Sequence, residues 1–422
     1  MKPRNRQTET SVGVQLTSRK LPLGWRWAKL GEVCELNPTR PAGFSRPEDT
    51  QTSFVPMAAV DDLTGTVARP EVRPYSAVKK GYTYFAEGDV LFAKITPCMQ
   101  NGKHTIARGL TDGVGFGTTE FHVLRPGPEI TAEWIHSFIR QPWVLHEATR
   151  HFTGAVGQQR VPETFLADLD LPLPPLPEQR RIAGILNEQM REVEKARRAT
   201  EAQLEAASVL PAAYLRGVFD SQEARRWPKK RLGDVCEIVG GNSLPAAGEA
   251  TDGDRVYCLK VSDLDGPYYD GQRLNGGAFF TSRILAGNRI LEPGAVVFPK
   301  RGGAIATNKK RILAVPSVLD PNLMGVQPVS QDVLLPSYLH RWFDSWSLAS
   351  LQSGNVIPQI NRQDLAPLVI PLPPISVQTY VTKSLRDLID RAKQVCSDLS
   401  DRLAEVNKLP AALLRKAFAG GV

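Results

Sequence analysis

The sequence has no long hydrophobic run and few cysteines. No apolar run in its 422 residues approaches the ~20 residues that a membrane-spanning helix needs, so we expect no membrane span. The five cysteines are scattered and never form a CxxC pair, which argues against a disulfide framework and a structural zinc site and favours reduced, mostly buried thiols. Residues 1–20 lack the hydrophobic stretch of a signal peptide, and we expect them to form a disordered tail on a cytoplasmic protein.

The signatures of several enzyme classes are also missing. No GxxxxGK[ST] segment occurs, so we do not expect this chain to hydrolyse ATP, and no Asn/Asp-Pro-Pro-aromatic tetrapeptide of the amino-methyltransferases occurs either. The six histidines form no HxxxH or HExxH pattern. The glycine-rich segment Gly113–Gly117 precedes strand-like residues rather than a helix, and we expect a structural turn there. The sequence therefore predicts no catalytic residue, no metal site and no cofactor bound by this chain.

What the sequence does contain is an internal repeat with an offset of about 200 residues. Leu30–Leu36 and Leu232–Ile238 are identical at five of seven positions, and Leu210–Phe219 and Leu409–Phe418 at seven of ten. Three further pairs of similar segments occur in the same order, namely 87–94 with 293–300, 154–156 with 354–356, and the PLPP segments 172–175 with 371–374. This period is too long for a solenoid repeat, so we infer a tandem duplication of a whole domain with an attached helix.

Each copy begins with short β-branched and aromatic runs bounded by Gly, Pro and Asp, which is typical of strands. Amphipathic segments at 133–150 and 336–351 predict helices packed on those strands. The predicted fold class is therefore α+β, with two tandem domains. The predicted strands are 54–60, 82–85, 90–92, 121–124, 256–261, 295–298 and 312–315.

After each PLPP segment the hydrophobic pattern changes to that of a long helix with a single apolar stripe. We expect domains at 21–176 and 220–375, followed by helices at 177–219 and 376–422 that pair with each other as a coiled coil. A kink or a new short helix is expected at Pro211 and Pro410. The predicted seam residues are Ile182, Leu186, Val193 and Leu204 in the first helix, and Leu385, Leu388, Val395, Leu399 and Val406 in the second.

The formal net charge of +8 permits a polyanionic partner but does not require one, because no segment is a basic tail. Two loops, each after a predicted strand, combine Lys or Arg with Gly and small polar residues, a composition typical of contacts to phosphates and base edges. A solvated surface turn is the alternative for either loop. The candidate DNA-binding residues are Lys94, Thr96, Gln100, Asn101 and Lys103 in the first copy, and Lys300, Arg301, Thr307, Asn308, Lys309, Lys310 and Arg311 in the second.

A further basic cluster, Arg225–Arg231, lies between the first predicted helix and the second domain. The sequence favours neither a phosphate contact nor a simple linker for this cluster.

At this point the motifs resemble a known family, the specificity subunits (HsdS) of type I restriction-modification enzymes. The resemblance rests on the order, along nearly the whole chain, of Leu21–Trp25, Leu30–Val33, Gly117–Pro126, Gly354–Asn361 and the two PLPP-to-helix boundaries. It implies two target recognition domains, each reading one half of a split, asymmetric DNA sequence. It also implies that the two helices pack antiparallel as a spacer between them.

The resemblance further implies the partners of the chain. These are double-stranded DNA, two methyltransferase subunits that use S-adenosylmethionine to modify adenine, and restriction subunits that use ATP and Mg²⁺. The chain itself would then catalyse nothing.

Two other classes of function remain open from the residues alone. One is a self-sufficient nuclease or methyltransferase with an unrecognised site, and the other is an interaction scaffold without a role on DNA.

Overall fold

The structure is a computed structural model that describes residues 21–68, 71–155, 158–246, 248, 250–251, 253–271, 273–351 and 358–421. The tail expected at residues 1–20 and the family-motif segment Gly354–Ile357 lie outside the described residues. None of the helices in these ranges combines the length and the apolar character that crossing a membrane requires.

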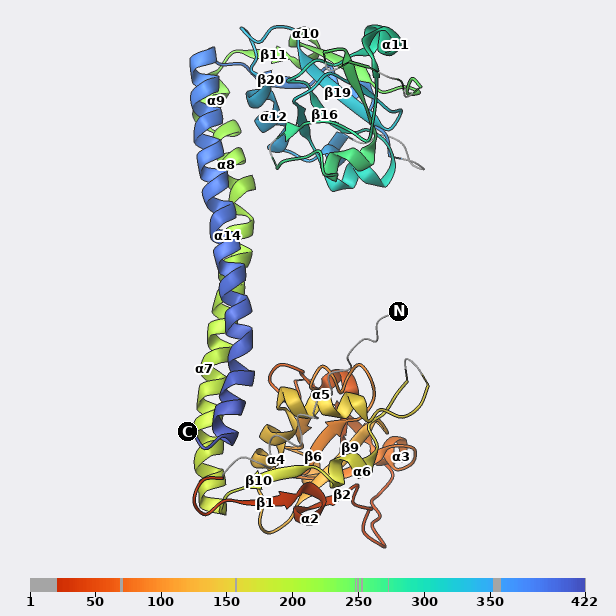
Figure 1. Cartoon of the computed structure of the whole chain (residues 1–422), viewed down its shortest axis with the longest axis vertical. Coiled ribbons are helices and arrows are strands. Elements are labelled where there is room, and N and C mark those ends of the chain that lie inside the picture. The colour runs from red at the N-terminus through yellow and green to blue at the C-terminus, as the bar shows by residue number, and fades with distance from the viewer. Residues whose placement is uncertain are drawn as a thin grey trace, which may run out of the picture. The chain divides into compact units, whose positions relative to one another are not determined.

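The chain divides into two compact units, and each long helical region contributes to both. Unit 1 combines residues 1–201 with residues 401–422, and unit 2 spans residues 202–400. Each unit therefore holds one β-rich domain together with a segment from each long helical region (Figure 1).

The part of unit 1 before residue 202 begins with short strands and ends with the start of the first long helix. Its strands are β1 (Arg26–Lys29), β2 (Cys34–Leu36), β3 (Gln51–Val55), β4 (Glu71–Pro74), β5 (Thr83–Ala86), β6 (Val90–Ala93), β7 (His104–Ile106), β8 (Val114–Gly117), β9 (Phe121–Pro126) and β10 (Asp170–Leu173). Its helices are α2 (Leu30–Val33), α3 (Tyr75–Val78), α4 (Ala132–Ile139), α5 (Pro142–Arg150), α6 (Glu163–Ala167) and the start of α7 (Leu176–Ser208), with 3-10 turns η1 (Met57–Ala59) and η2 (Thr111–Gly113).

Unit 2 repeats this plan. Its strands are β11 (Lys229–Arg231), β12 (Cys236–Gly240), β13 (Arg255–Leu259), β14 (Arg273–Leu274), β15 (Phe279–Ser282), β16 (Val296–Pro299), β17 (Arg311–Leu313), β18 (Ser317–Leu319), β19 (Leu323–Pro328) and β20 (Val369–Pro371). Its helices are α8 (Leu210–Phe219), α9 (Gln222–Arg226), α10 (Leu232–Val235), α11 (Arg283–Ala286), α12 (Pro336–Asp344), α13 (Arg362–Leu365) and the start of α14 (Ile375–Phe418), with 3-10 turns η3 (Val261–Asp265), η4 (Gly287–Arg289), η5 (Gly302–Thr307) and η6 (Leu348–Leu351).

The sheets show the duplication directly. The strand order β2-β9-β6-β7 in unit 1 matches β12-β19-β16-β17 in unit 2, where β14 adds an edge. Cys34 and Cys236 each begin the first strand of this sheet and lie opposite Pro126 and Pro328 in its neighbour. Both thiols are buried, and burial raises the pKa of each to about 12. The two cysteines are thus one strand position seen twice, as the sequence repeat predicts.

The second sheet differs between the units. Unit 1 has the order β4-β3-β8-β5, whereas the described residues of unit 2 form the order β15-β13-β18. Residues 114–117, which we expected to be part of a turn, form β8, an inner strand paired with both β3 and β5. The sequence misled here because the glycines suggested a turn. Gly115 and Gly117 instead leave room for the ring of Phe85, which a Cβ at either position would approach within 3.1 Å.

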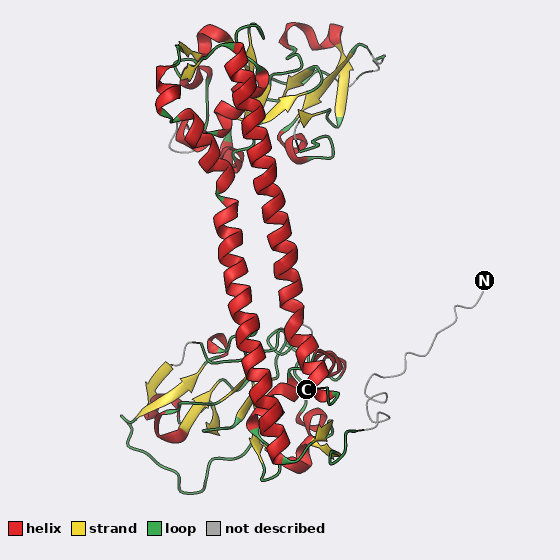
Figure 2. Ribbon diagram, turned by 90° about the vertical axis from the view of Figure 1, so that its left-hand side faces the viewer, coloured by secondary structure: helices red, strands yellow, loops and turns green. Residues whose placement is uncertain are grey.

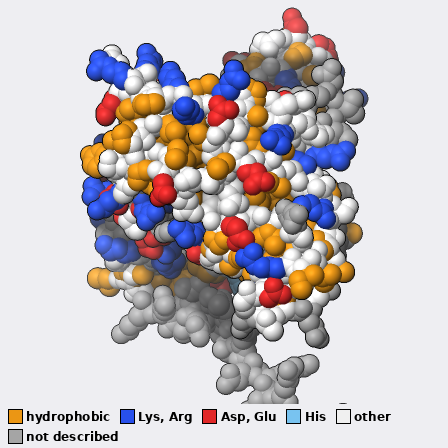
Figure 3. Space-filling view, turned by 90° about the horizontal axis from the view of Figure 1, so that it is seen from above, with side chains coloured by type: hydrophobic (Ala, Val, Ile, Leu, Met, Phe, Trp, Pro, Cys, Tyr) orange, Lys and Arg blue, Asp and Glu red, His pale blue; other side chains and the backbone are white. Residues whose placement is uncertain are grey.

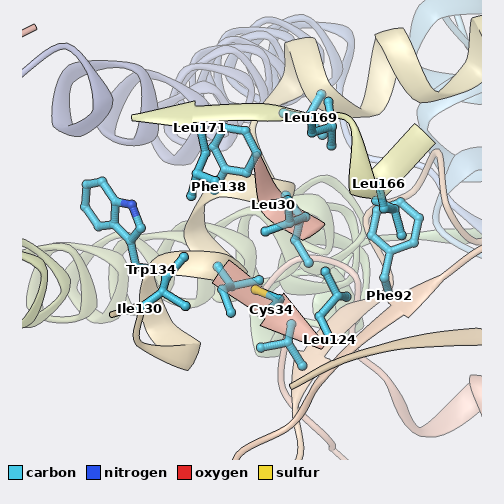
Figure 4. Packing of buried hydrophobic residues seen from close by; sticks show 14 of the residues in the cluster. Leu30, Cys34, Phe92, Leu124, Ile130, Trp134, Phe138, Leu166, Leu169 and Leu171 are labelled. Atoms are coloured by element: carbon cyan, nitrogen blue, oxygen red, sulfur yellow. The ribbon is translucent and has the colours of Figure 1, made fainter. Parts of the chain in front are cut away.

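The core of unit 1 joins the sheet to its helices. Leu30, Cys34, Phe92 and Leu124 pack with Trp134 of α4 (Figure 4). The predicted helix at 133–150 is interrupted after Ile139, and α5 starts at Pro142, whose missing N–H is tolerated in a first turn. The predicted helix at 336–351 likewise separates into α12 and η6.

Within each unit the start of one long helical region packs beside the end of the other, so the two run antiparallel (Figure 2). In unit 1, Ile182 of α7 shares a buried cluster with Leu414 of α14. In unit 2, Phe219 of α8 shares one with Leu385 of α14. These contacts, with the duplicated sheets, confirm the predicted fold class of two tandem α+β domains with an antiparallel helical pair.

The seam of the coiled coil has a different phase on α14 from the one we predicted. Leu388 and Val395 are exposed, and Ile389 is buried and Cys396 half-buried in their place. At 100° per residue, positions 388 and 389 lie about 60° and 40° on either side of Leu385, so spacing alone does not choose between them. The other predicted seam residues are buried or half-buried, namely Ile182, Leu186, Val193, Leu204, Leu385, Leu399 and Val406.

The expected interruption occurs at only one of the two late prolines. Val209 separates α7 from α8, which places Pro211 in the first turn of a new helix. By contrast, α14 continues through Pro410.

A buried glutamine fastens each long helix to its own domain. The Nε2 of Gln179 donates to the backbone oxygens of Glu129 and Pro174, and its Oε1 accepts from the Thr131 N–H. The Gln378 side chain makes the same three bonds in unit 2, to Val333, Pro373 and Leu335. The angle at which each helix leaves its domain is therefore held by the same amide.

Candidate nucleic-acid interface

Both candidate loops start where an inner strand of the duplicated sheet ends. Lys94 follows β6, and Lys300 follows β16. The Lys94 oxygen accepts from the Val161 N–H at 2.9 Å, and the Lys300 oxygen accepts from the Ile360 N–H at 2.9 Å. The two lysines therefore occupy the same backbone position in the two units.

Two further backbone contacts extend this equivalence. The backbone N–H of Lys94 donates to the backbone oxygen of Glu120, and the backbone N–H of Lys300 donates to the backbone oxygen of Asn322. Single β-bridges join Ile95 to Arg160 and Arg301 to Gln359. We call these positions the strand-end cluster, which consists of Lys94, Ile95, Glu120 and Arg160 in unit 1 and of Lys300, Arg301, Asn322 and Gln359 in unit 2.

In unit 1 the cluster contains a bidentate ion pair between Arg160 and Glu120. Arg160 donates to both carboxylate oxygens of Glu120, from Nε at 2.8 Å and from Nη2 at 2.7 Å. These hydrogen bonds hold the pKa of Glu120 below its usual value. Lys94 lies half-buried beside this pair, and desolvation lowers its pKa although Glu120 and Glu163 favour its charge.

In unit 2 the cluster has no carboxylate at the position of Glu120. Lys300 is half-buried, its pKa is lowered by desolvation, and its Nζ lies 3.4 Å from the Gly241 oxygen. The Arg301 side chain is exposed and forms no hydrogen bond or ion pair with any described residue. The second cluster is therefore the more open of the two toward an anionic partner.

The remaining candidates of unit 1 line the same loop. Gln100 and Asn101 are exposed, and Thr96 is half-buried with its backbone N–H bonded to Gln159. The Nζ of Lys103 donates to the Val60 oxygen at 2.7 Å. Lys103 thus ties its loop to the neighbouring segment and has less freedom to reach a partner.

The remaining candidates of unit 2 are mostly engaged. The Thr307 hydroxyl donates to the Ala304 oxygen, and the Asn308 Oδ1 accepts from the Leu348 N–H. Lys309 and Arg311 both pair with Asp265, which holds the pKa of that carboxyl below its usual value. The guanidinium of Arg311 also lies over the Tyr269 ring, 3.9 Å from its centre.

Lys310 does not belong to an exposed surface. Its side chain is only 2% exposed, and its Nζ donates to the Trp346 oxygen at 2.6 Å. Burial lowers the pKa of Lys310 to about 8. Sequence composition cannot show this inward orientation, and we leave Lys310 out of the proposed DNA contacts.

Sequence composition missed Arg160, Glu120, Asn322 and Gln359. The one signal was the turn that reads Gly157–Arg160 in the first copy and Pro358–Asn361 in the second. The bridges show that both segments pair with the basic loop, with Arg160 at the position of Gln359 rather than at that of Asn361.

The basic cluster Arg225–Arg231 is divided between two elements. Arg225 and Arg226 end α9, Trp227 packs against the core of unit 2, and Lys229–Arg231 form the exposed strand β11 beside β20. Part of this cluster is therefore structural, and its exposed lysines remain available for an anion.

The charge on the surface is mixed. On the face of unit 2 seen in Figure 3, basic and acidic side chains are interspersed among hydrophobic ones. Among the described residues no group of three or more His, Cys, Asp or Glu side chains could hold a metal ion.

Comparison with known proteins places this fold. Residues 22–205 match the family model described as type I restriction modification DNA specificity domain. The EcoEI specificity subunit of Escherichia coli is 37% identical over 206 residues, which cover 49% of this chain and 34% of that protein. The chain thus spans about a third of the length of the curated relatives that it matches at this level of identity.

Two solved structures share the fold over nearly the whole chain. The HsdS subunit from Thermoanaerobacter tengcongensis has a TM-score of 0.64 at 24% identity and covers 96% of this chain and 99% of its own. A chain from a structure of the type I R-M system, described for its complex assembly and conformational transition, has a TM-score of 0.75 at 24% identity and covers 96% of this chain and 100% of its own.

The tandem α+β domains with their helical pair are thus the architecture of an HsdS subunit. Residues 22–205 are thus similar to a type I restriction-modification DNA specificity domain, and the chain as a whole shares the fold of the HsdS subunit.

Proposed function

We propose that the chain is the DNA recognition subunit of a type I restriction-modification complex, with each domain reading one half of a bipartite, asymmetric target. The observation that supports this most is the strand-end cluster. The same backbone hydrogen bonds build it in both domains, yet three of its four side chains differ. Two readers with one framework and different side chains suit a target whose halves differ.

We also propose that the helices set the spacing between the half-sites. A helix of fixed length holds a reader at a fixed distance and rotation on the duplex, as the spacing of dimeric DNA-binding proteins does. The clamps formed by Gln179 and Gln378 support this role, because they keep each domain from turning on its own helix.

In this proposal the helices dock two methyltransferase subunits. Leu388 and Val395 of α14 are exposed apolar side chains that lie seven residues apart and therefore on one helix face. The methyltransferase subunits would supply S-adenosylmethionine chemistry at adenine, and restriction subunits would use ATP and Mg²⁺. The chain would act in the cytoplasm and would contribute recognition rather than catalysis.

The test is to express the chain with its methyltransferase subunits in cells without other adenine methylation and to sequence the methylated adenines. The proposal expects a single bipartite motif, and it expects no methylation from the methyltransferase subunits alone. Methylation with the same sequence preference in cells that lack this chain would contradict it.

A further inference from the structure

Each unit places one arginine at the same β-bridge, but from opposite sides of that bridge. In unit 1 the arginine is Arg160, which faces Ile95, and in unit 2 it is Arg301, which faces Gln359. Backbone hydrogen bonds next to the two bridges confirm that they are equivalent. The Thr96 N–H donates to the Gln159 backbone oxygen in unit 1, and the Gly302 N–H donates to the Pro358 backbone oxygen in unit 2. Directly opposed residues of a bridge extend their side chains to one face, about 5 Å apart. The duplication has therefore kept a guanidinium on this face while moving it from one segment to the other.

The lysine beside the bridge behaves differently, because it is the same residue at the same position in both units. Lys94 follows β6 and Lys300 follows β16, and both residues are half-buried. A contact that every sequence can use, such as one to a backbone phosphate, needs no change between two half-sites. A contact that reads a base must change its position or its chemistry when the half-site changes.

The guanidinium of Arg160 is held in place for such a contact. Two of its five N–H groups donate to the Glu120 carboxylate, and a third, on Nη1, donates to the backbone oxygen of Gln158 at 3.0 Å. One N–H on each terminal nitrogen remains. An arginine presents two N–H groups in this way to O6 and N7 of guanine in the major groove.

Among the described residues, no side chain supports Arg301 in this way, and the equivalent positions of the cluster carry amides. Asn322 stands where unit 1 has Glu120, and the Gln359 side chain opposite Arg301 donates to the Asn361 Oδ1 at 2.7 Å. Arg301 is therefore exposed, none of its side-chain donors bonds to a described residue, and the carboxamides of Asn322 and Gln359 also suit base edges.

We propose that Arg160 and Arg301 each contact a guanine in the half-site of their own domain, that Glu120 is a positioning residue for Arg160, and that Lys94 and Lys300 contact the adjacent phosphates. This assignment rests on the proposed function above. It makes Arg160, Arg301 and Glu120 determinants of specificity, and it makes the two lysines determinants of affinity.

The test uses the complex of the full chain with its methyltransferase subunits, methylating a DNA library in which each half-site base is randomised in turn. Arg160→Lys should reduce the preference for one G·C pair in one half-site by about 5- to 100-fold, and Arg301→Lys should do so for one pair in the other half-site. Glu120→Gln should weaken the same preference as Arg160→Lys, but less. Lys94→Ala should lower methylation evenly for all sequences and reduce the salt dependence by about one ion.

Arg26→Lys is the matched control, because Arg26 also pairs with a glutamate, Glu129, on the surface of unit 1. This variant should leave every preference unchanged. If the wild-type complex has a bipartite target and Arg160→Lys and Arg301→Lys leave its base preferences intact, or weaken methylation evenly for all sequences, the guanine assignment is wrong while the proposed function stands. A wild-type complex without a bipartite preference would overturn both.

Discussion

At the scale of single residues, a glutamine at the start of each long helix attaches that helix to its domain. Gln179 and Gln378 are fully buried, and each amide bonds to three backbone groups of its domain. Because a buried polar group left without a partner costs about 1–3 kcal/mol, these bonds help to fix the junction between each helix and its domain.

We predict that Gln378→Leu lowers the free energy of unfolding by about 2–4 kcal/mol, since it leaves the Leu335 N–H and the Val333 and Pro373 oxygens without partners. Chemical denaturation of the full chain measures this. Gln394→Leu is the control, because Gln394 is exposed on the same helix and should change stability by less than about 0.5 kcal/mol. Equal effects of the two substitutions would show that the clamp has no special role.

A buried histidine pair makes stability depend on pH. The ring of His104 stacks on Phe92, and its backbone oxygen lies 3.0 Å from the His136 Nε2. Burial, together with the nearby Arg140 guanidinium, lowers the pKa of His136 to about 3, and it lowers the pKa of His104 well below its usual value. Both histidines are therefore neutral in the folded protein at neutral pH.

The sign of the effect follows from proton binding. An unfolded histidine titrates near pH 6.5, so between about pH 6.5 and 3 the unfolded chain binds protons that the folded chain does not. Stability is full above pH 6.5 and falls as the pH drops, by up to about 1.4 kcal/mol per pH unit for each histidine. His136→Gln should lower the number of protons taken up on unfolding by about one between pH 6 and 4. Denaturation measured across this pH range gives that number as the slope of the free energy of unfolding against pH. The exposed His146→Gln should not lower it, and equal slopes for His136→Gln and the wild type would refute the prediction.

At the scale of elements, the hydrophobic pattern predicted the paired helices but not which residues of α14 form their seam. The pattern predicted two long paired helices and their start after each PLPP segment, because a 3-4 spacing of apolar residues defines a stripe. It did not determine the phase of the stripe on α14, since Leu388 and Ile389 are equally apolar neighbours. Only packing against the partner helix decides between them.

We predict that Ile389→Ala lowers the free energy of unfolding by about 2–4 kcal/mol, because Ile389 is 4% exposed within the core of unit 2. Leu388→Ala should cost less than about 1 kcal/mol, because Leu388 is 37% exposed. Denaturation of both variants compares adjacent residues of similar size. If Leu388→Ala lowered the free energy of unfolding more than Ile389→Ala, the seam would run through Leu388, as expected from the sequence.

The candidate interface shows the same division between pattern and packing. Recurrence of basic residues after a strand located Lys94 and Lys300 correctly at equivalent positions. It included Lys310, which points inward to Trp346, because composition carries no direction. It missed Arg160, since the bridge to Ile95 joins segments about 65 residues apart and only the folded chain brings them together.

At the scale of the whole molecule, duplication explains both the likeness and the divergence of the halves. The sheet that contains β6 or β16, the buried cysteines and the glutamine clamps are repeated, whereas the second sheet and three of the four strand-end side chains differ. Conserved architecture with changed side chains is expected where two domains must be held alike but read different sequences. The proposed function therefore assigns recognition of each half-site to one domain.

The exchange of one domain tests this most directly. Residues 21–176 are replaced by the corresponding domain of another family member with a different target, and the methylated adenines are sequenced in cells that also express the methyltransferase subunits. The account predicts a hybrid motif in which one half-site changes and the other half-site stays as in the wild type. An unchanged motif, or a change in both half-sites, would contradict it.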